Sequence, residues 1–480
     1  MPFNDPAYLD ITLGIIKSEI QSGRTVVILQ LKNGSRHFEY YSSRLLNFFH
    51  RQNPAQRFNE DVVSLGVQII DESSNLLKNV VDPNLLLGNQ EFQVSLKSTL
   101  ITLFSDSIVT SNRKVRNVQR EIQQTSLKVY ELTKMYLNKY PTTKILVPNG
   151  RFADQKAFYL ACVDQNIGQK SIYFFEKGFT GKTYYLGEYS LHDRVKMQAS
   201  IISKISTSRR IDASLWFHSR ERSELANEFN RAWHKSHELD SDISSSKIAT
   251  FFDSSADEFE SLGPDWHTSF WEDQWQAFVI VAQYLSYKGF KIELRLHPNI
   301  INKSRAEKLR LRENVAKFQE FLPHARIFSA TSKVSSYDLI KRSELIVVWN
   351  STVGIEASFR SKPVVHLQAS EWDLSIPVLQ LKDASEVEGF EMRLPKPNPE
   401  QALNYIAGRM SLDNAVTTNE YSEKYITIES QSFIFRFAKN IAGGENILLA
   451  TFKSLFPISK NSAYILFRKL YFKIKIWTMQ

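Results

Sequence analysis

The stretch 248–367 alternates short β-rich runs with helical segments, and this alternation restricts the fold more than any other feature of the chain. Alternating β and α units imply a parallel sheet with right-handed crossovers. The run 345–349 is apolar throughout, as expected of a strand that is covered on both faces. Strands are predicted at 248–252, 292–296, 325–328, 345–349 and 364–367, and helices at 271–288, 303–319, 336–342 and 353–360.

The length of 480 residues suits two domains with extensions better than one core. We predict a first α/β domain over 1–235 with a helical insertion near 85–140, a polar, Ser-rich linker at 236–247, and a second domain over 248–400. Residues 401–480 form a C-terminal helical and basic extension. In the first domain strands are predicted at 25–31, 144–147 and 171–175, and helices at 7–22, 114–139, 152–165 and 215–235.

Cysteine content and targeting signals favour a cytoplasmic protein. Cys162 is the single cysteine, which excludes an intrachain disulfide and indicates a reducing compartment. No signal peptide and no apolar run of membrane-spanning length are expected. The chain has neither a GxGxxG nor a P-loop motif, which argues against dinucleotide and P-loop chemistry. No basic–aromatic motif supports a nucleic-acid partner.

The positive charge is concentrated near the C-terminus. The net charge is +9, and residues 421–480 hold nine Lys and Arg against three acids. Within 464–477 four cations lie among large apolar and aromatic side chains without an acid. This composition predicts peripheral docking on the anionic inner membrane. The alternative is a terminal segment that packs on the body of the protein.

The loops at the carboxyl ends of the second-domain strands carry the candidate binding residues. Ligands of doubly wound sheets bind beyond these ends. Small hydroxyls, one histidine and carboxylates gather there on a single edge. The candidate donor-binding residues are Asp253, Ser254, His297, Pro298, Asn299, Ser336, Tyr337, Asn350, Ser351, Thr352, Gly354 and Glu356.

The run from Asn350 to Glu356 leads from a strand into a helix. Exposed amides at a helix N-terminus favour phosphate, and Gly354 would let a ligand approach the backbone. Glu356 could hold two ribose hydroxyls. The alternative is an ordinary helix cap at Ser351 or Thr352, with Glu356 as a first-turn acid.

His297 stands where proline ends a strand. An imidazole at this edge can donate to a phosphate oxygen and stabilise a departing nucleotide, which makes it a catalytic candidate. The alternative is a surface or packed histidine beside a turn-forming proline.

The first domain offers loop-side groups as well. We predict acceptor-side roles for Asn149, Gly150, Arg151 and His192. Asp154 and Glu176 are the candidates for a catalytic general base, because both lie in or just after loops at strand ends.

Several of these segments together resemble the capsule polysaccharide biosynthesis glycosyltransferases, a broad group that includes Kdo transferases. The resemblance covers about 145–370. It is carried by the run from Phe251 to Phe259, by Asp273-Gln274, Arg295-Leu296-His297-Pro298-Asn299, Ser336-Tyr337, the run from Ser351 to Ala357 and Lys362-Pro363, and in the first domain by the run from Asn149 to Phe152 and by His192-Asp193.

The resemblance implies a GT-B-like fold, in which two Rossmann-like domains face each other across a cleft. It implies a nucleotide-sugar donor on the second domain, a glycan or glycolipid acceptor on the first, and no metal or other cofactor. His297 and the loop from Ser351 to Gly354 would bind donor phosphate, and Glu356 the ribose. The expected function is glycosyl transfer to a surface polysaccharide or its lipid-linked precursor.

Two alternatives share this fold. One is a polyol-phosphate transferase that uses a CDP-alcohol. The other is a non-catalytic partner in capsule assembly or export, since a fold does not determine a function.

Overall fold

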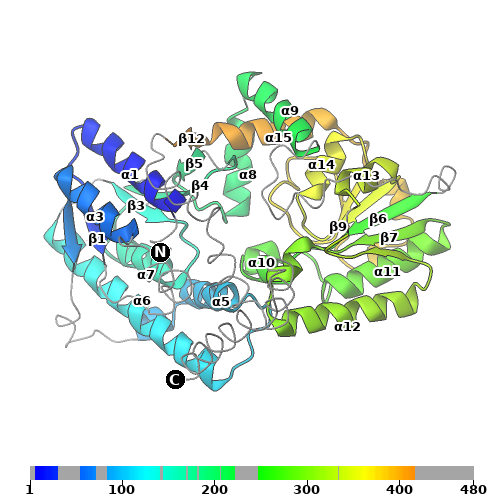
Figure 1. Ribbon diagram of the computed structural model, residues 1–480, viewed down its shortest axis with the longest axis horizontal. Coiled ribbons are helices and arrows are strands. Elements are labelled where there is room, and N and C mark those ends of the chain that lie inside the picture. Colours follow the sequence, from blue (N-terminus) through cyan, green and yellow to red (C-terminus); the bar gives the residue numbers. More distant parts are fainter. Residues whose placement is uncertain are drawn as a thin grey trace, which may run out of the picture. The chain divides into compact units, whose positions relative to one another are not determined.

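The computed structural model describes residues 6–30, 54–71, 84–140, 144–168, 171–180, 183–205, 207–221, 247–332 and 334–416 (Figure 1). The chain divides into two compact units, 1–423 and 424–480, and every described residue belongs to the first. Residues 236–246 of the predicted linker and the predicted membrane-docking tail at 464–477 lie outside the described residues.

The second half is built on a six-stranded parallel sheet in the order β8-β7-β6-β9-β10-β11. Numbered along the chain, this order is 3-2-1-4-5-6, that of the Rossmann fold. The α/β prediction is therefore confirmed here, and β11 is an additional edge strand. The strands are β6 (Ile248–Phe252), β7 (Lys291–Arg295), β8 (Arg326–Phe328), β9 (Leu345–Val348), β10 (Val364–His366) and β11 (Leu379–Gln380).

Helices cover both faces of this sheet (Figure 1). Side chains alternate between the faces, so Phe251 enters the core under α11 and α12 while Phe252 enters the core under α13, α14 and α15. All four residues of β9 are buried, as its apolar sequence predicts. The helices are α10 (Ala256–Glu260), α11 (Gln274–Tyr287), α12 (Arg305–Phe321), α13 (Ser336–Arg342), α14 (Val353–Phe359) and α15 (Pro399–Ser411), with 3-10 turns η5 (Pro264–Trp266), η6 (Pro298–Asn302), η7 (Ala384–Glu386) and η8 (Phe390–Arg393).

The first half is also α/β, but its main sheet is mixed, in the order β12-β5-β4-β3. β3 and β4 are parallel, whereas β5 is antiparallel to both β4 and β12. Only residues 178–182 join β4 to β5, and so short a connection permits antiparallel pairing alone. The strands are β3 (Ile145–Pro148), β4 (Ile172–Lys177), β5 (Thr183–Gly187) and β12 (Asp413–Ala415), and a separate parallel pair consists of β1 (Val27–Gln30) and β2 (Gln68–Asp71).

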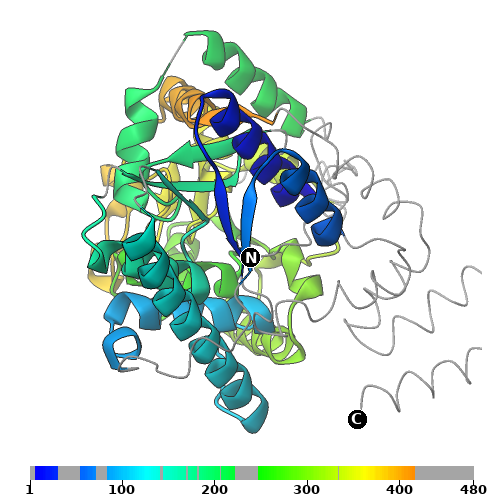
Figure 2. The same cartoon turned by 90° about the vertical axis from the view of Figure 1, so that its left-hand side faces the viewer.

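Helices α4, α5 and α6 form the insertion predicted near 85–140. They pack with α7 around one apolar core that includes Phe92, Ile122 and Ala157. Figure 2 shows α1 and α3 side by side, away from this bundle. The helices of the first half are α1 (Pro6–Gln21), α3 (Pro54–Ser64), α4 (Asn84–Leu87), α5 (Gln90–Phe104), α6 (Arg113–Lys139), α7 (Ala153–Asp164), α8 (Arg194–Ser203) and α9 (Thr207–Glu221).

Helix α15 joins the two halves. It packs against α14 of the second half and against α8 and α9 of the first. The chain then enters β12, which pairs with β5, so the second half ends by completing the sheet of the first. The predicted division between residues 400 and 401 falls inside α15.

Buried polar contacts also connect the halves. Arg194 of α8 pairs with Asp373 at 2.6 Å, and both side chains are largely buried. The indole N–H of Trp266 donates to the carbonyl of His192 at 3.1 Å. These contacts, with α15, hold the two sheets in one compact unit.

In the part of the chain that the structure describes, no helix is both long and apolar enough to cross a bilayer.

Gly408 provides a test of the packing of α15. A β-carbon at this position would collide with the carbonyl oxygen of Ile201 in α8. We expect Gly408→Ala to lower the free energy of unfolding by about 1–3 kcal/mol, as overpacking usually does. Gly168→Ala is the control, because a β-carbon there would meet no atom within 4 Å. Equal urea denaturation curves for both variants would show that α15 does not need this close contact.

Candidate functional site

The strand order of the parallel sheet creates a topological switch point at the carboxyl edge of the sheet. β6 and β9 are neighbours, but the chain leaves β6 toward β7 on one side and leaves β9 toward β10 on the other. The loops therefore diverge, and in open α/β sheets this is where ligands bind. Asp253 and Ser254 follow β6, and Asn350, Ser351 and Thr352 follow β9.

Asp253 is a buried carboxylate at this point. It accepts hydrogen bonds from the side-chain amide of Gln274 and, at 3.3 Å, from the backbone N–H of His297. Burial raises the pKa of Asp253 to about 7, although both hydrogen bonds oppose the shift. Asp253 thus ties the loop after β6 to the loop after β7.

His297 caps the 3-10 turn η6. Its Nδ1 accepts the backbone N–H of Asn299 at 3.3 Å, which assigns the ring proton of the neutral imidazole to Nε2. Burial lowers the pKa of His297, so the neutral form prevails near pH 7. The ring is therefore prepared to donate from Nε2. Pro298 is buried beneath the turn, and the side chain of Asn299 donates to Glu258.

The loop after β9 caps its own helix. Ser351 Oγ accepts the N–H of Val353 at 3.3 Å, and the carbonyl of Ser351 accepts the N–H of Gly354 at 3.1 Å. The backbone N–H groups of Val353 and Gly354, which were predicted to bind phosphate, thus already have hydrogen-bond acceptors. Thr352 is exposed, and Asn350 is half-buried.

The expected role of Gly354 needs correction. A β-carbon at this position would collide with the indole of Trp372, which lies against the backbone. Gly354 is therefore required by packing within the second half, and the space above its Cα is not available to a ligand.

Glu356 also differs from its prediction. It is 3% exposed, and its Oε1 lies 2.9–3.0 Å from two guanidinium nitrogens of Arg220 in α9. The phenol of Tyr337 is buried beside this pair, and burial followed by the Glu356 charge raises the pKa of Tyr337. Oε1 of Glu356 thus binds a residue of the first half, a contact that the prediction of a ribose-binding role did not include.

Two buried hydroxyl oxygens belong to the loop after β6 and to the first residue of α13. Ser254 Oγ and Ser336 Oγ are each enclosed without a hydrogen-bond partner. Arg295, at the end of β7, holds the loop after β8 by donating to the carbonyls of Ser329 and Ser332 at 2.8 and 3.2 Å. The predicted residues of four strand ends are therefore brought to one edge.

In the first half, Asn149 and Gly150 form a tight turn after β3. Asn149 has a φ of 53° and Gly150 a φ of 81°, both in the left-handed region. A β-carbon on Gly150 would collide with the ring of Phe174. The side chain of Asn149 donates to Glu176 and accepts the N–H of Arg151 at 3.0 Å. The turn thus directs Arg151 toward the second half.

Arg151 donates to Ser261 Oγ, just after α10, and lies 4.7 Å from the ring centre of Phe152. Burial lowers the pKa of Arg151 to about 10, which leaves it charged at neutral pH. Burial, and then the Arg151 charge, lower the pKa of His192 to about 3. A neutral histidine and a buried guanidinium thus lie where the halves meet.

The two candidate bases lie in different settings. Glu176, near the end of β4, accepts hydrogen bonds through both oxygens, from Asn149 and from the N–H of Lys177 at 2.9 Å. These bonds assign it a structural part in the 149–150 turn. Asp154 lies in the first turn of α7, where the helix dipole favours a negative charge.

Other polar residues at these loops had no predicted role. Arg220 lies within a predicted helix, but no pattern in the sequence pairs it with Glu356. Gln274 belongs to a segment that carries the family resemblance, which was the available signal for its contact with Asp253. Lys303, discussed below, had no sequence signal, because its partners are set by tertiary packing.

Among the residues that the structure describes, no group of three or more His, Cys, Asp or Glu is placed to hold an ion.

Comparison with known proteins gives a loose structural likeness. No family profile matches the chain, and no curated sequence matches it. Solved structures similar to the chain include a β-Kdo 2,4-transferase, KpsC, of Thermosulfurimonas dismutans, at 13% identity and a TM-score of 0.36, covering 55% of this chain and 79% of that one. A β-Kdo 2,7-transferase from the same organism has 12% identity, a TM-score of 0.33 and coverages of 62% and 89%. A UDP-GlcNAc 2-epimerase of Neisseria meningitidis, bound to UDP-GlcNAc, has 10% identity, a TM-score of 0.27 and coverages of 84% and 99%.

The Arg220–Glu356 pair predicts a stability effect. We expect Glu356→Gln to lower the free energy of unfolding by about 1–3 kcal/mol, because it leaves the partly buried guanidinium of Arg220 without its counter-charge. Glu400→Gln is the control, since Glu400 pairs with Arg210 on an exposed surface. Urea denaturation measures both. A Glu356→Gln variant as stable as the control would mean that the pair contributes nothing.

His192 predicts a pH dependence. The unfolded chain takes up a proton on this residue below about pH 6.5, whereas the folded chain does so only near pH 3. The free energy of unfolding should therefore decrease as the pH is lowered through this window, by up to about 1.4 kcal/mol per pH unit from this group. His192→Gln should lose less stability between pH 6 and 4 than the parent. The raised pKa of Asp253 acts in the opposite sense, but Asp253 is present in both the parent and the variant. An equal change of unfolding free energy with pH in the two proteins would therefore contradict the prediction.

Proposed function

We propose that the chain is a glycosyltransferase that moves a sugar from a nucleotide-activated donor to a surface polysaccharide or its lipid-linked precursor. The proposal joins the resemblance of residues 145–370 to capsule polysaccharide glycosyltransferases with the chemistry at the sheet edge. The donor nucleotide would lie beyond the carboxyl ends of β6, β7 and β9, and the acceptor on the first half, in a GT-B-like arrangement.

The observation that carries the proposal is the state of His297. A neutral imidazole with its proton on Nε2, held at the carboxyl edge of a Rossmann-type sheet, can donate to the phosphate oxygen on which charge develops as the glycosidic bond breaks. Ser351 and Thr352 follow β9, which is separated from β7 by β6 alone, and would add hydroxyls to the same phosphates. The ribose contact of Glu356 is not part of the proposal, because Arg220 occupies that carboxylate.

The first half would supply the acceptor side. Asn149, Gly150, Arg151 and His192 lie around the turn after β3 and at the contact with Ser261 and Trp266. The general base is proposed in the same half. Of the two candidates Asp154 is favoured, because the carboxylate oxygens of Glu176 hold the turn in place. A base there must reach the acceptor hydroxyl directly or through one water.

Replacement of His297 tests the catalytic role. We expect His297→Ala to reduce kcat about 100-fold or more, as does the loss of one donor to a developing charge. His324→Ala is the control, because His324 is exposed at the end of α12. Sugar transfer from labelled donors to membrane-extracted acceptor would be measured. Near-parental turnover of His297→Ala would assign the residue a structural part only.

Binding and transfer assays on the parent protein distinguish the glycosyltransferase from the two alternative functions. A thermal-shift series with CMP, CDP, UDP and GDP reports nucleotide binding, since a ligand of the native state raises the melting temperature. Transfer of a polyol phosphate from a CDP-alcohol would favour the phosphotransferase. Absence of any shift and of any turnover would favour the non-catalytic partner.

A further inference from the structure

We propose that Lys303 is a positioning residue for His297, and that with Asp257 and Glu258 it clamps the turn on which the imidazole stands. The functional consequence rests on the proposed role of His297, whereas the clamp itself can be observed in the free protein. Lys303 follows η6 directly, and Asp257 and Glu258 lie in the first turn of α10.

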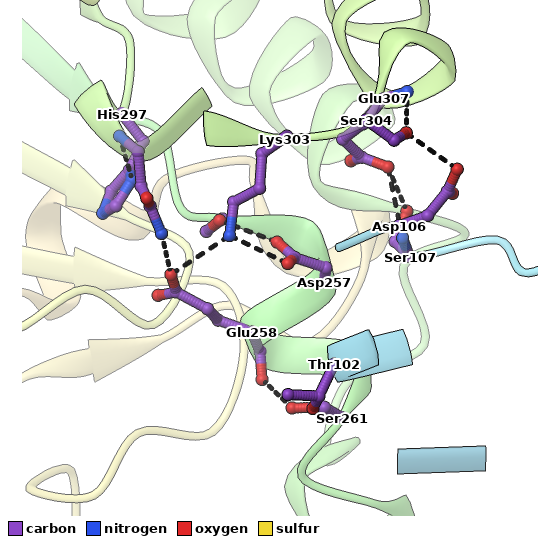
Figure 3. Close-up of polar contacts among 12 residues, drawn as sticks. Thr102, Asp106, Ser107, Asp257, Glu258, Ser261, His297, Lys303, Ser304 and Glu307 are labelled. Carbon is purple, nitrogen blue, oxygen red and sulfur yellow. Dashed lines mark hydrogen bonds and ion pairs between the residues drawn. The ribbon is translucent and has the colours of Figure 1, made fainter. Parts of the chain in front are cut away.

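The clamp has two attachments (Figure 3). Lys303 Nζ lies 2.8 Å from Asp257 Oδ2 and 3.3 Å from Glu258 Oε1. The side-chain amide of Asn299 donates to the same Oε1 of Glu258. The two carboxylates thus hold η6 near its beginning through Asn299 and just beyond its end through Lys303. His297, whose Nδ1 accepts the N–H of Asn299, is fixed by the same arrangement.

The burial of Lys303 separates this clamp from a surface ion pair. The side chain of Lys303 is 6% exposed and that of Asp257 is 8% exposed, whereas Glu258 is 57% exposed, so the contact with Asp257 is the buried part of the clamp. A lysine normally keeps its ammonium in water, so enclosure is tolerated only because two carboxylates surround it. Its low exposure also leaves no room for a phosphate at Nζ, which is why the residue positions rather than binds.

A second set of contacts anchors the next residues to the first half. Ser304 Oγ caps α12 and donates to Asp106 at 2.9 Å, and Glu307 accepts the N–H and hydroxyl of Ser107 at 3.2 and 3.0 Å (Figure 3). Arg310 pairs with Asp106 and Glu307. The segment from His297 to Arg310 is therefore held by α10 on one side and by the loop after α5 on the other.

The charges near His297 predict what removal of Lys303 does. Glu258 and Asp257 favour the protonated imidazole, whereas Lys303 and Arg295 oppose it, and Asp253 accepts the backbone N–H of His297. Without Lys303 the two acids lose their neutralising cation. The pKa of His297 should then rise, and the turn that selects the Nε2–H tautomer should loosen.

The experiment compares Lys303→Met with Lys317→Met, which replaces an exposed lysine in the following helix α12, in the full chain labelled with ¹⁵N-histidine. His297→Gln identifies the resonance. We expect the parent and Lys317→Met to show one neutral Nε2–H tautomer, and Lys303→Met to show mixed tautomers and a higher midpoint of titration. In transfer assays kcat should fall roughly 10-fold or more, with a smaller change in KM, because a misplaced group acts mainly in the transition state.

A second variant guards against simple unfolding, since Asp257 is left buried without its partner. Asp257→Asn combined with Lys303→Met removes both charges and should restore stability but not the tautomer. A parental tautomer and titration in either folded variant would overturn the proposal. If Lys303→Met loses the single tautomer but the parent protein neither binds a nucleotide nor transfers a sugar, the clamp is upheld. The proposed function is then rejected instead.

Discussion

The parallel pairing of β6 with β9 is the constraint on which the site depends. Both strands are buried on both faces, so their register is held by apolar packing against helices above and below. Their loops must diverge, because the crossovers lead to opposite sides of the sheet. Polar residues of the loops after β6, β7 and β9 gather at this edge.

Three charged pairs among the described residues connect separate elements. Glu356 joins α14 to α9, Arg194 joins α8 to the loop near Asp373, and Lys303 joins η6 to α10. Buried ion pairs add little net stability over apolar side chains, but removal of one partner is strongly unfavourable. They therefore specify which segments meet, and three such pairs lie close to the proposed donor site or at the contact of the two halves.

The two halves differ in how their sheets are made. The second is a Rossmann-order sheet, whereas the first is mixed and incomplete without β12, which comes from the far end of the described chain. α15 crosses between them and packs tightly on α8 at Gly408. Because residues 413–415 complete the first sheet, the chain returns from the second half to the first. The two halves are therefore not joined by a simple linker alone.

The sequence alone determined the strands of 248–367 and the helices α11 to α14, because apolar runs and amphipathic periods are local signals that packing reinforces, but it did not indicate the short helix α10. It also determined which residues follow each strand, and hence that Asp253, His297 and Asn350 lie at one edge. It did not determine the mixed sheet of the first half, because β5 was not among the predicted strands and its partner β12 lies more than two hundred residues further along the chain. Nor did it assign Glu356 to Arg220, Gly354 to Trp372 or Lys303 to Asp257. A carboxylate or glycine at a helix start has the same local pattern whether it meets a ligand or another side chain, and only the tertiary structure decides which neighbour fills the space.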